Sequence, residues 1–117
     1  MTMTTFTIPL PPTANHIWKS SGKRRFLSSE YRAFKGMVAL IVKRERVPRF
    51  GGKRMAVAVE LCFPNKRRCD ISNRVKALED ALTEAGVWDD DSQVDQLHVR
   101  RGEIVKGGCA VVTLEEI

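Results

Sequence analysis

Hydrophobic and polar positions alternate in three segments of the chain, with the two-residue period of strands that bury one face. These segments are residues 6–10, 55–63 and 97–100, and a last strand is predicted over residues 110–114, after the turn at Gly107-Gly108. The first segment runs into Pro11-Pro12, and proline cannot donate to a strand ladder, so we expect this strand at a sheet edge. Two further segments carry the three-to-four-residue spacing of amphipathic helices.

The first helix is predicted between a serine cap and a proline. Ser28 or Ser29 has the side chain that a helix N-terminus prefers, and Pro48 cannot continue a helix. Its buried face is expected to consist of Tyr31, Phe34, Val38 and Ile41. The polar stretch before it, residues 13–27, is punctuated by glycine and serine and is predicted to be a loop.

The second helix is predicted to begin at Asp70, a natural N-cap, and to end before Gly86, which suits the position just after a helix. Its buried stripe is expected to consist of Ile71, Val75, Leu78 and Leu82. Trp88 follows shortly afterwards and is expected in the core or at an interface.

The predicted order of elements is β-α-β-α-β-β, with no internal repeat and no linker. A chain of 117 residues can bury one modest core, so we expect a single domain over residues 1–117. We predict an α/β fold of the two-layer α+β type, in which two α-helices cover one face of a small mixed β-sheet.

The net charge of +6 at neutral pH, with a pI near 9.6, favours an anionic partner. One group of basic residues lies before Glu30, the first acidic residue, and a second group lies just before Asp70. We expect both groups to contact DNA phosphates, and Trp18 to stack on a base, although a solvated basic loop is the alternative. The two groups consist of Lys19, Lys23, Arg24 and Arg25, and of Lys66, Arg67 and Arg68.

The cysteines and histidines are too dispersed for a disulfide framework or a zinc site. Cys62, Cys69 and Cys109 show no paired spacing, so we expect reduced thiols. His16 and His98 are expected to be ordinary polar residues. No apolar run reaches membrane-spanning length, and the N-terminus lacks a signal pattern, so we expect a cytoplasmic protein with no membrane partner.

Acidic and basic residues meet around the second predicted helix in a pattern that suits phosphodiester hydrolysis. Asp70 begins the helix, Lys76 faces away from its buried stripe, and Asp89-Asp90-Asp91 follow it. Carboxylates beside basic side chains can hold Mg²⁺, which polarises a phosphate and generates hydroxide. A protein that only bound DNA would gain nothing from these aspartates, because they repel phosphate. The alternatives are a plain helix cap and a solvated acidic turn.

Three ordered blocks around these residues resemble the RusA family of Holliday junction resolvases. They are residues 67–73 (RRCDISN), 76–83 (KALEDALT) and 86–94 (GVWDDDSQV). Residues 10–15 (LPPTAN) and 106–108 (KGG) are also similar to that family. The resemblance therefore spans nearly the whole chain.

The resemblance implies a homodimeric crossover junction endodeoxyribonuclease. Such an enzyme binds four-way DNA junctions and resolves them by paired symmetric cleavage in DNA recombination and repair. The implied cofactor is Mg²⁺, with Mn²⁺ as a substitute, and no small-molecule cofactor is expected. Asp70, Lys76 and Asp91 match the family's catalytic residues. The implied metal ligands are Asp70, Asp90 and Asp91, with Ser72 at the position of a further ligand.

Two positions depart from the family pattern. Ser72 stands where an aspartate is common, which predicts weaker metal binding, and Cys69 stands where arginine is frequent, which removes one phosphate contact. Lys76 is expected either to neutralise a phosphate oxygen or to protonate the leaving group. The alternatives are a junction-binding protein that has lost cleavage through Ser72, and a basic interaction module without DNA specificity.

The chain geometry leaves two arrangements of the site open. A helix over residues 72–85 carries the chain roughly 20 Å from Asp70, at about 1.5 Å per residue. Residues 86–91 can only just cover that distance, at roughly 3.5 Å per residue. Asp91 therefore returns almost fully extended along its own helix, or it meets Asp70 of the partner subunit.

Overall fold

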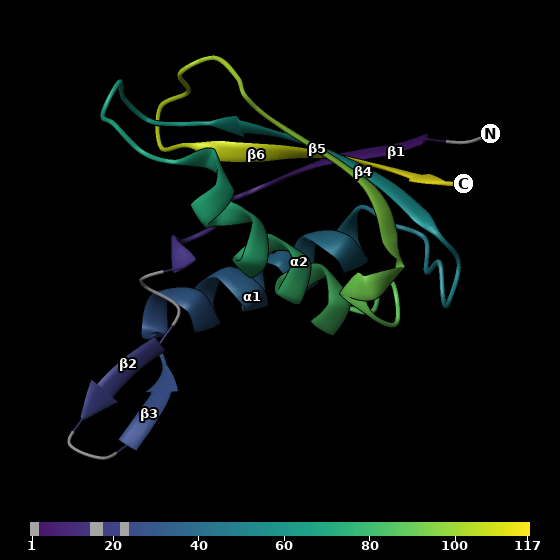
Figure 1. Cartoon of the computed structure of the whole chain (residues 1–117), viewed down its shortest axis with the longest axis horizontal. Helices are drawn as coiled ribbons and strands as arrows, with labels where there is room; N and C mark the ends of the chain where they lie inside the picture. Colours follow the sequence, from purple (N-terminus) through teal and green to yellow (C-terminus); the bar gives the residue numbers. More distant parts are fainter. Residues whose placement is uncertain (1–2, 15–17, 22–23) are drawn as a thin grey trace.

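A four-stranded sheet lies over two helices, and both helices cover the same face of the sheet (Figure 1). The computed structural model describes residues 3–14, 18–21 and 24–117. The strand order in the sheet is β1-β6-β4-β5. The elements of the two layers are β1 (Met3–Ile8), α1 (Ser29–Arg44), β4 (Met55–Cys62), α2 (Val75–Glu84), β5 (Val94–Arg101) and β6 (Cys109–Glu116).

The sheet is mixed, as predicted. Strand β6 pairs antiparallel with both β1 and β4, whereas β5 runs parallel to β4. A parallel pair needs a crossover connection, and α2 supplies it. The predicted fold class, a small two-layer α+β arrangement, is therefore confirmed.

The core lies between the sheet and the helices and follows the predicted hydrophobic positions closely. The buried face of α1 consists of the four residues that the spacing predicted, and Ser28 is its N-cap, because its Oγ accepts the Tyr31 N–H at 3.1 Å. Alternate residues of β4 face these helices. Trp88 is 1% exposed, in agreement with the core position expected for it. The buried residues of β4 include Met55, Val57, Val59 and Leu61.

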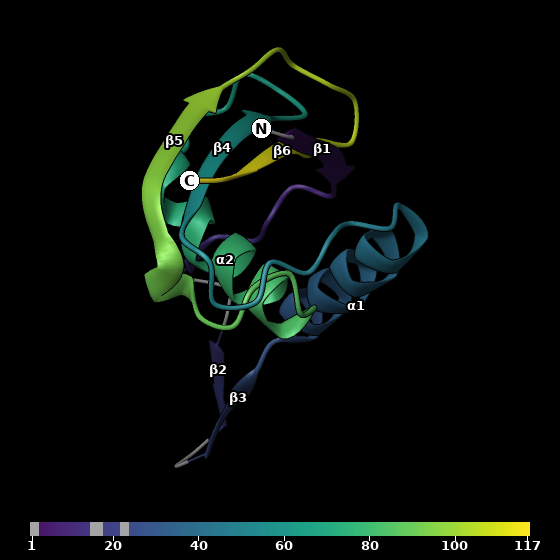
Figure 2. The same cartoon turned by 90° about the vertical axis from the view of Figure 1, so that its right-hand side faces the viewer.

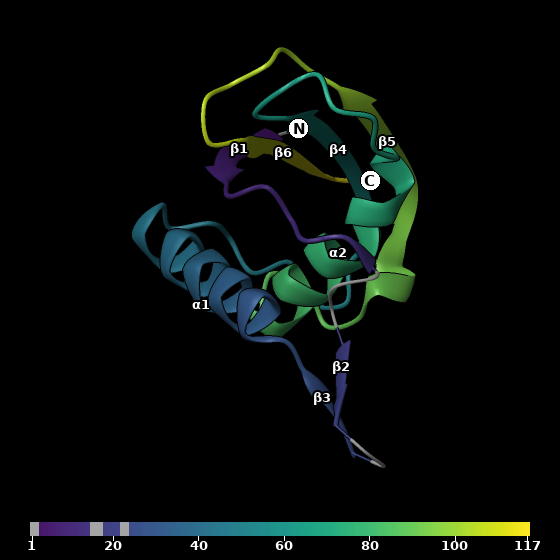
Figure 3. The ribbon, with the colours of Figure 1, turned by 90° about the vertical axis from the view of Figure 1, so that its left-hand side faces the viewer.

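The loop predicted over residues 13–27 is wrong in part, because this stretch contains a hairpin. Strands β2 (Trp18–Ser21) and β3 (Arg24–Leu27) pair antiparallel and form a separate two-stranded sheet. Figures 2 and 3 show this hairpin extending away from the sheet, beyond the helix layer. The sequence of residues 18–27 (WKSSGKRRFL) lacks the hydrophobic-polar alternation from which a strand is predicted.

The predicted stripe of the second helix is half correct. Leu78 and Leu82 are buried, but Ile71 and Val75 are only half-buried. The helix begins with a 3₁₀ turn, η2 (Ile71–Arg74), before α2. A 3₁₀ helix has 3.0 residues per turn, so the buried positions shift relative to a continuous α-helix. Ala77 and Ala81 complete the buried face instead.

Strand β5 lies at a sheet edge, and its hydrophobic residues are less buried than those of β4. Leu97 and Val99 alternate as predicted, yet Leu97 is 44% exposed while Val99 packs against the core. The three cysteines are free thiols, as expected. Among the described residues, neither helix has the length and apolar character needed to cross a bilayer.

Candidate functional site

Asp70 presents an exposed carboxylate where the chain enters η2. Its backbone is extended, and its carbonyl accepts the Asn73 N–H at 3.3 Å. An N-cap aspartate ordinarily accepts a backbone N–H through its side chain. Asp70 occupies the N-cap position, as predicted, but its side chain makes no such bond, so the prediction of a side-chain cap is wrong. Its carboxylate is therefore available for another ligand.

Lys76 lies between two carboxylates. Its Nζ is 3.0 Å from Oδ1 of Asp80 and 3.5 Å from Oδ2 of Asp91. The hydrogen bond to Asp80 and the charge of that carboxylate, together with Asp91, raise the pKa of Lys76. Its side chain is 61% exposed, in agreement with the prediction that it faces away from the core. Lys76 is thus a protonated, accessible cation at neutral pH.

Asp91 is held beside α2 of its own chain. A short 3₁₀ turn, η3 (Asp91–Gln93), begins at Asp91. Its Oδ1 is 3.4 Å from the Thr83 hydroxyl, which also lies 2.9 Å from the Glu79 carbonyl. The buried Trp88 indole donates to the same hydroxyl at 2.6 Å. The core therefore positions Thr83, and Thr83 together with Lys76 positions the Asp91 carboxylate.

The three consecutive aspartates do not act as one group. The Asp90 carboxylate accepts the Ser92 hydroxyl at 2.9 Å and forms a capping box with Gln93. The hydrogen bonds from Ser92, followed by those from Asp91, lower the pKa of Asp90. Asp89 is exposed and contributes its backbone N–H to the same turn. The turn itself therefore separates the three carboxylates.

Gln93 fixes this acidic turn, and our sequence reasoning did not identify it. Its side chain is buried, accepts the N–H groups of Asp89 and Asp90 at 3.0 and 2.8 Å, and donates to the carbonyls of Gly51 and Lys53 at 2.7 Å each. The spacing of a capping-box glutamine three residues after Asp90 is the signal that could have identified it.

An open cavity of about 390 Å³ contains the Lys76 ammonium. Two of its polar residues, Asp80 and Tyr31, were not predicted as site residues, although Tyr31 was predicted on the buried face of α1. The Tyr31 hydroxyl donates to Asp80 at 3.3 Å. The (i, i+4) spacing of Lys76 and Asp80 is the signal that could have found Asp80. The lining consists of Trp18, Tyr31, Lys35, Lys76, Asp80, Thr83 and Glu84.

The two predicted DNA-binding groups lie in different parts of the fold. Lys66, Arg67 and Arg68 line a second cavity, at the ends of β4 and β5. Trp18 on the hairpin is 46% exposed, and His98 is exposed on β5. The side chains of Lys19, Arg24 and Arg25 lie outside the described part, as do Lys23 and His16 entirely. DNA contact by any of these residues stays a prediction.

The predicted metal ligands do not form a cluster in the single chain. Within residues 3–14, 18–21 and 24–117, no three acidic, histidine or cysteine side chains lie close enough together to hold a metal ion. Asp70 and Ser72 are exposed at the start of η2, whereas Asp90 and Asp91 are engaged in the contacts described above. Their oxygens suit Mg²⁺ chemically, but one chain does not assemble them.

The chain is similar to known endodeoxyribonucleases along nearly its whole length. Residues 9–114 match the family model described as "Endodeoxyribonuclease RusA". A crossover junction endodeoxyribonuclease RusA from Escherichia coli (strain K12) is 34% identical over 111 residues, which cover 95% of this chain and 92% of that protein. A crossover junction endodeoxyribonuclease rusA from Enterobacteria phage 82 is 34% identical over 95% of this chain and 92% of its own length. The protein of the same name from Enterobacteria phage HK97 is 31% identical over 96% of this chain and 93% of its own length.

Proposed function

Because the chain belongs to the RusA family of endodeoxyribonucleases, we propose that it hydrolyses phosphodiester bonds in four-way DNA junctions. The curated relatives are named crossover junction endodeoxyribonucleases, and this chain spans more than nine-tenths of their length. The proposed reaction is paired symmetric cleavage of two strands, in DNA recombination and repair. The catalytic residues of this proposal are Asp70, Lys76 and Asp91.

The observation that best supports the proposal is the position of Lys76 in an open cavity beside Asp91. Its raised pKa keeps the ammonium protonated at neutral pH, so Lys76 cannot be the general base. An ammonium at this place either stabilises negative charge on a phosphoryl oxygen or donates a proton to the leaving oxygen. Both roles agree with its contacts.

The family implies a divalent cation, and we propose Mg²⁺ with Mn²⁺ as a substitute. Hard cations bind oxygen ligands, and the proposed ligands are Asp70, Asp90 and Asp91, with Ser72 as a weaker one. These side chains do not converge in one chain among the described residues. Mg²⁺ is commonly held by one or two carboxylates, and water and substrate phosphate oxygens then complete its shell.

We further propose a homodimer, because two symmetric cuts in one junction match the two-fold symmetry of a dimer. Asp91 contacts α2 of its own chain, and a shared site would add Asp70 of the partner subunit. Mixing Asp70→Asn subunits with Asp91→Asn subunits tests this. If sites are shared, a mixed dimer has both substitutions in one active site and neither in the other, so the intact site should cleave. Absence of activity in verified mixed dimers would contradict sharing.

Cleavage of a labelled four-way junction in the presence of Mg²⁺ tests the proposed function directly. We expect the wild type to cut the junction, and Asp70→Asn, Asp91→Asn and Lys76→Ala each to lose cleavage by about 100-fold or more while retaining junction binding. Asp89→Asn and Lys106→Ala are matched controls, since both residues are exposed. A wild-type rate in any of the three variants would show that its residue is not catalytic.

A junction-binding protein without cleavage is the second candidate, and Ser72 favours it. This exposed side chain offers a neutral hydroxyl instead of a carboxylate at the start of η2. The same assay separates the candidates, because this protein would bind junctions in metal-free buffer and leave them uncut in Mg²⁺. Equal affinity for a junction and a plain duplex would instead support a basic module without junction specificity.

A further inference from the structure

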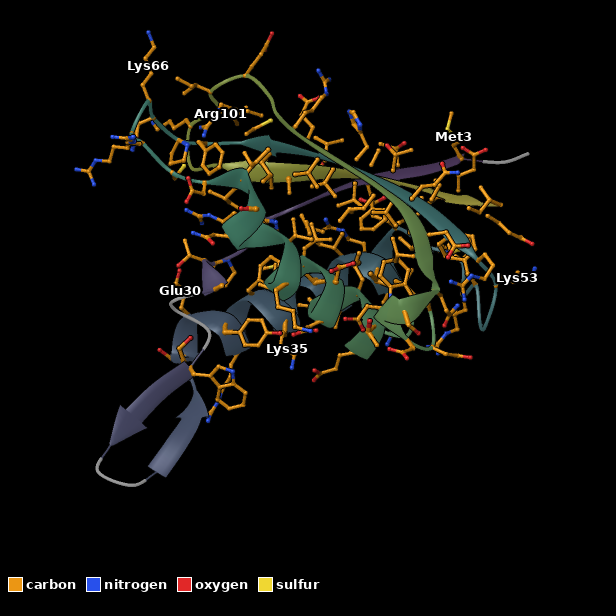
Figure 4. The ribbon with its side chains drawn as sticks, viewed as in Figure 1. Met3, Glu30, Lys35, Lys53, Lys66 and Arg101 are labelled. Atoms are coloured by element: carbon orange, nitrogen blue, oxygen red, sulfur yellow. The ribbon has the colours of Figure 1, made fainter. Side chains whose placement is uncertain are left out.

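A second cavity, of about 400 Å³, lies at the ends of β4 and β5, where it is formed by the loops that follow these strands. Four of its lining residues are cationic, and none of the lining residues in the described part of the chain is a carboxylate. Figure 4 shows Lys66 and Arg101 together at this end of the sheet, whereas Lys35 of the first cavity lies in the helix layer. The lining consists of Phe63, Asn65, Lys66, Arg67, Arg68, Cys69, Arg101, Gly102 and Ile104.

Arg101 is held in one position within this cavity. Its guanidinium carbon lies 4.5 Å from the centre of the Phe63 ring, and its Nη2 donates to the Cys69 carbonyl at 2.6 Å. Phe63 is only 3% exposed, so the ring is a fixed support rather than a surface for a base. A guanidinium that is already ordered loses less entropy when it binds a ligand.

The Arg101 guanidinium is not neutralised by a carboxylate in the described part of the chain. The neighbouring Arg100 pairs with Glu60, but every acceptor that Arg101 contacts there belongs to Cys69. A planar guanidinium has five N–H donors. Three hydrogen bonds to Cys69 therefore leave two donors for an anion, and a phosphate oxygen accepts charge-assisted hydrogen bonds from a guanidinium.

Backbone hydrogen bonds fix the two walls of the cavity. The Val105 N–H donates to the Phe63 carbonyl at 3.0 Å, and the Gly102 N–H donates to the Leu61 carbonyl at 2.9 Å. Asn65 orders the opposite loop by accepting the Arg67 N–H at 2.9 Å. The cations thus lie on a preformed site.

We propose that this cavity binds a backbone phosphodiester of the DNA strand, with Arg101 as its fixed guanidinium. The inference rests on the proposed function for the identity of the strand. Cys69, whose carbonyl holds Arg101, is covalently followed by Asp70. A phosphate bound here places the strand next to the exposed Asp70 carboxylate. Arg101 is therefore a strand-positioning residue, and it lies outside the basic runs evident in the sequence.

The test compares Arg101→Met with Arg100→Ala. In Arg101→Met, the methionine retains packing against Phe63 but lacks the guanidinium. Arg100→Ala is the control: it also removes one positive charge, but from a side chain that pairs with Glu60. We expect Arg101→Met to weaken junction binding in metal-free buffer about tenfold and to lower the salt slope by about one. Arg100→Ala should retain wild-type affinity and slope. Thermal melting checks that both variants fold.

A second measurement is independent of cleavage. Arginine Nε–Hε resonances of the wild type are followed by NMR while the dinucleotide dTpdT, which has one phosphodiester, is added. We expect saturable shifts at Arg101 and none at Arg100. Absence of an Arg101 shift, shifts with inorganic phosphate but not dTpdT, or equal binding losses in the two variants would overturn the inference. A wild type that binds dTpdT through Arg101 but cuts no junction would instead contradict the proposed function alone.

Discussion

Lys76 acquires its properties from two aspartates that approach it from different parts of the chain. Asp80 lies one helical turn further along α2, and Asp91 lies on the turn that returns beside this helix. The ammonium compensates both carboxylates when no DNA is bound. Under the proposed function, a DNA phosphate would compete with Asp80 and Asp91 for Lys76.

Substitution Ser72→Asp should raise cleavage at limiting Mg²⁺. A carboxylate is a stronger ligand for a hard cation than a neutral hydroxyl, and Ser72 is exposed at the start of η2, so an aspartate fits there. Titration of Mg²⁺ against cleavage rate should show half-maximal rate at a lower concentration in the variant, with little change in metal-free junction affinity. Ser29→Asp, at the exposed first residue of α1, is the control.

Coincident Mg²⁺ titrations for wild type and Ser72→Asp would mean that position 72 does not contribute to metal binding. Cleavage that occurs only in Ser72→Asp would establish the binding-only candidate. The residue at position 72 therefore distinguishes the cleaving enzyme from the binding-only candidate.

Glu79→Gln should stabilise the protein at neutral pH and not in acid. Burial, followed by the charge of Asp91, raises the pKa of Glu79 above its ordinary value of 4.5. The folded state therefore favours the neutral form of the Glu79 carboxyl. As pH rises from 4.5 through the raised pKa, the carboxyl ionises and the folded protein loses stability. Melting temperatures at pH 7 should be higher for Glu79→Gln than for wild type, and they should converge near pH 4.

Glu103→Gln is the matched control for that measurement, because Glu103 is exposed in the loop between β5 and β6. It should show no comparable difference between the two pH values. A Glu79→Gln protein that melts at or below the wild-type temperature at pH 7 would contradict the assigned cause.

At the level of elements, α2 and the turn after it bring the candidate residues together. Helix α2 buries Leu78 and Leu82 beneath the sheet and presents Lys76 and Asp80 on its accessible side. Gly86, with φ of 84°, ends the helix and directs the chain towards Trp88. Thr83 then joins the buried indole to the Asp91 carboxylate. The geometry of the site depends on this helix end.

Gly86→Ala and Gly36→Ala should change stability in opposite directions. An alanine at position 86 would adopt a left-handed conformation, and its Cβ would lie 2.9 Å from Nη1 of Arg49, so we expect a loss of about 1–2 kcal/mol. Gly36 lies within α1, where an added Cβ would meet nothing within 4 Å, so alanine there should add about 1 kcal/mol. Urea unfolding measures both; losses of similar size in both variants would contradict this account.

At the level of the whole molecule, basic residues occur both on the hairpin strands and at the opposite loops of the sheet. The hairpin extends beyond the helix layer, whereas Lys66 lies at the top of the sheet in the same view (Figure 4). A ligand that reaches both groups must be long. Junction arms satisfy this requirement, because phosphates are repeated along each strand.

Junction binding should therefore depend strongly on salt. If about six phosphates are neutralised, affinity should fall by about three orders of magnitude between roughly 50 and 200 mM salt. A quadruple variant should weaken binding without loss of fold, and it should lower the slope of log affinity against log salt concentration by up to about four. Its substitutions are alanine for Arg24, Arg25, Arg67 and Arg68. The control replaces exposed cations near the end of α1 and in the following turn, namely Lys43, Arg44, Arg46 and Lys53. Equal losses in the two quadruple variants would indicate non-specific attraction.

Local periodicity in the sequence was sufficient to determine the buried face of α1, the alternation of β4 and the glycine that ends α2, because neighbouring residues decide these features. The resemblance of three short blocks to one family was likewise evident from the sequence alone. The hairpin was not, because its sequence lacks hydrophobic-polar alternation. Only the tertiary structure brought Asp91 to Lys76, Gln93 to the carbonyls of residues 51 and 53, and Arg101 to Cys69. Such contacts join residues from separate elements, so they depend on how the sheet and helices pack rather than on local spacing.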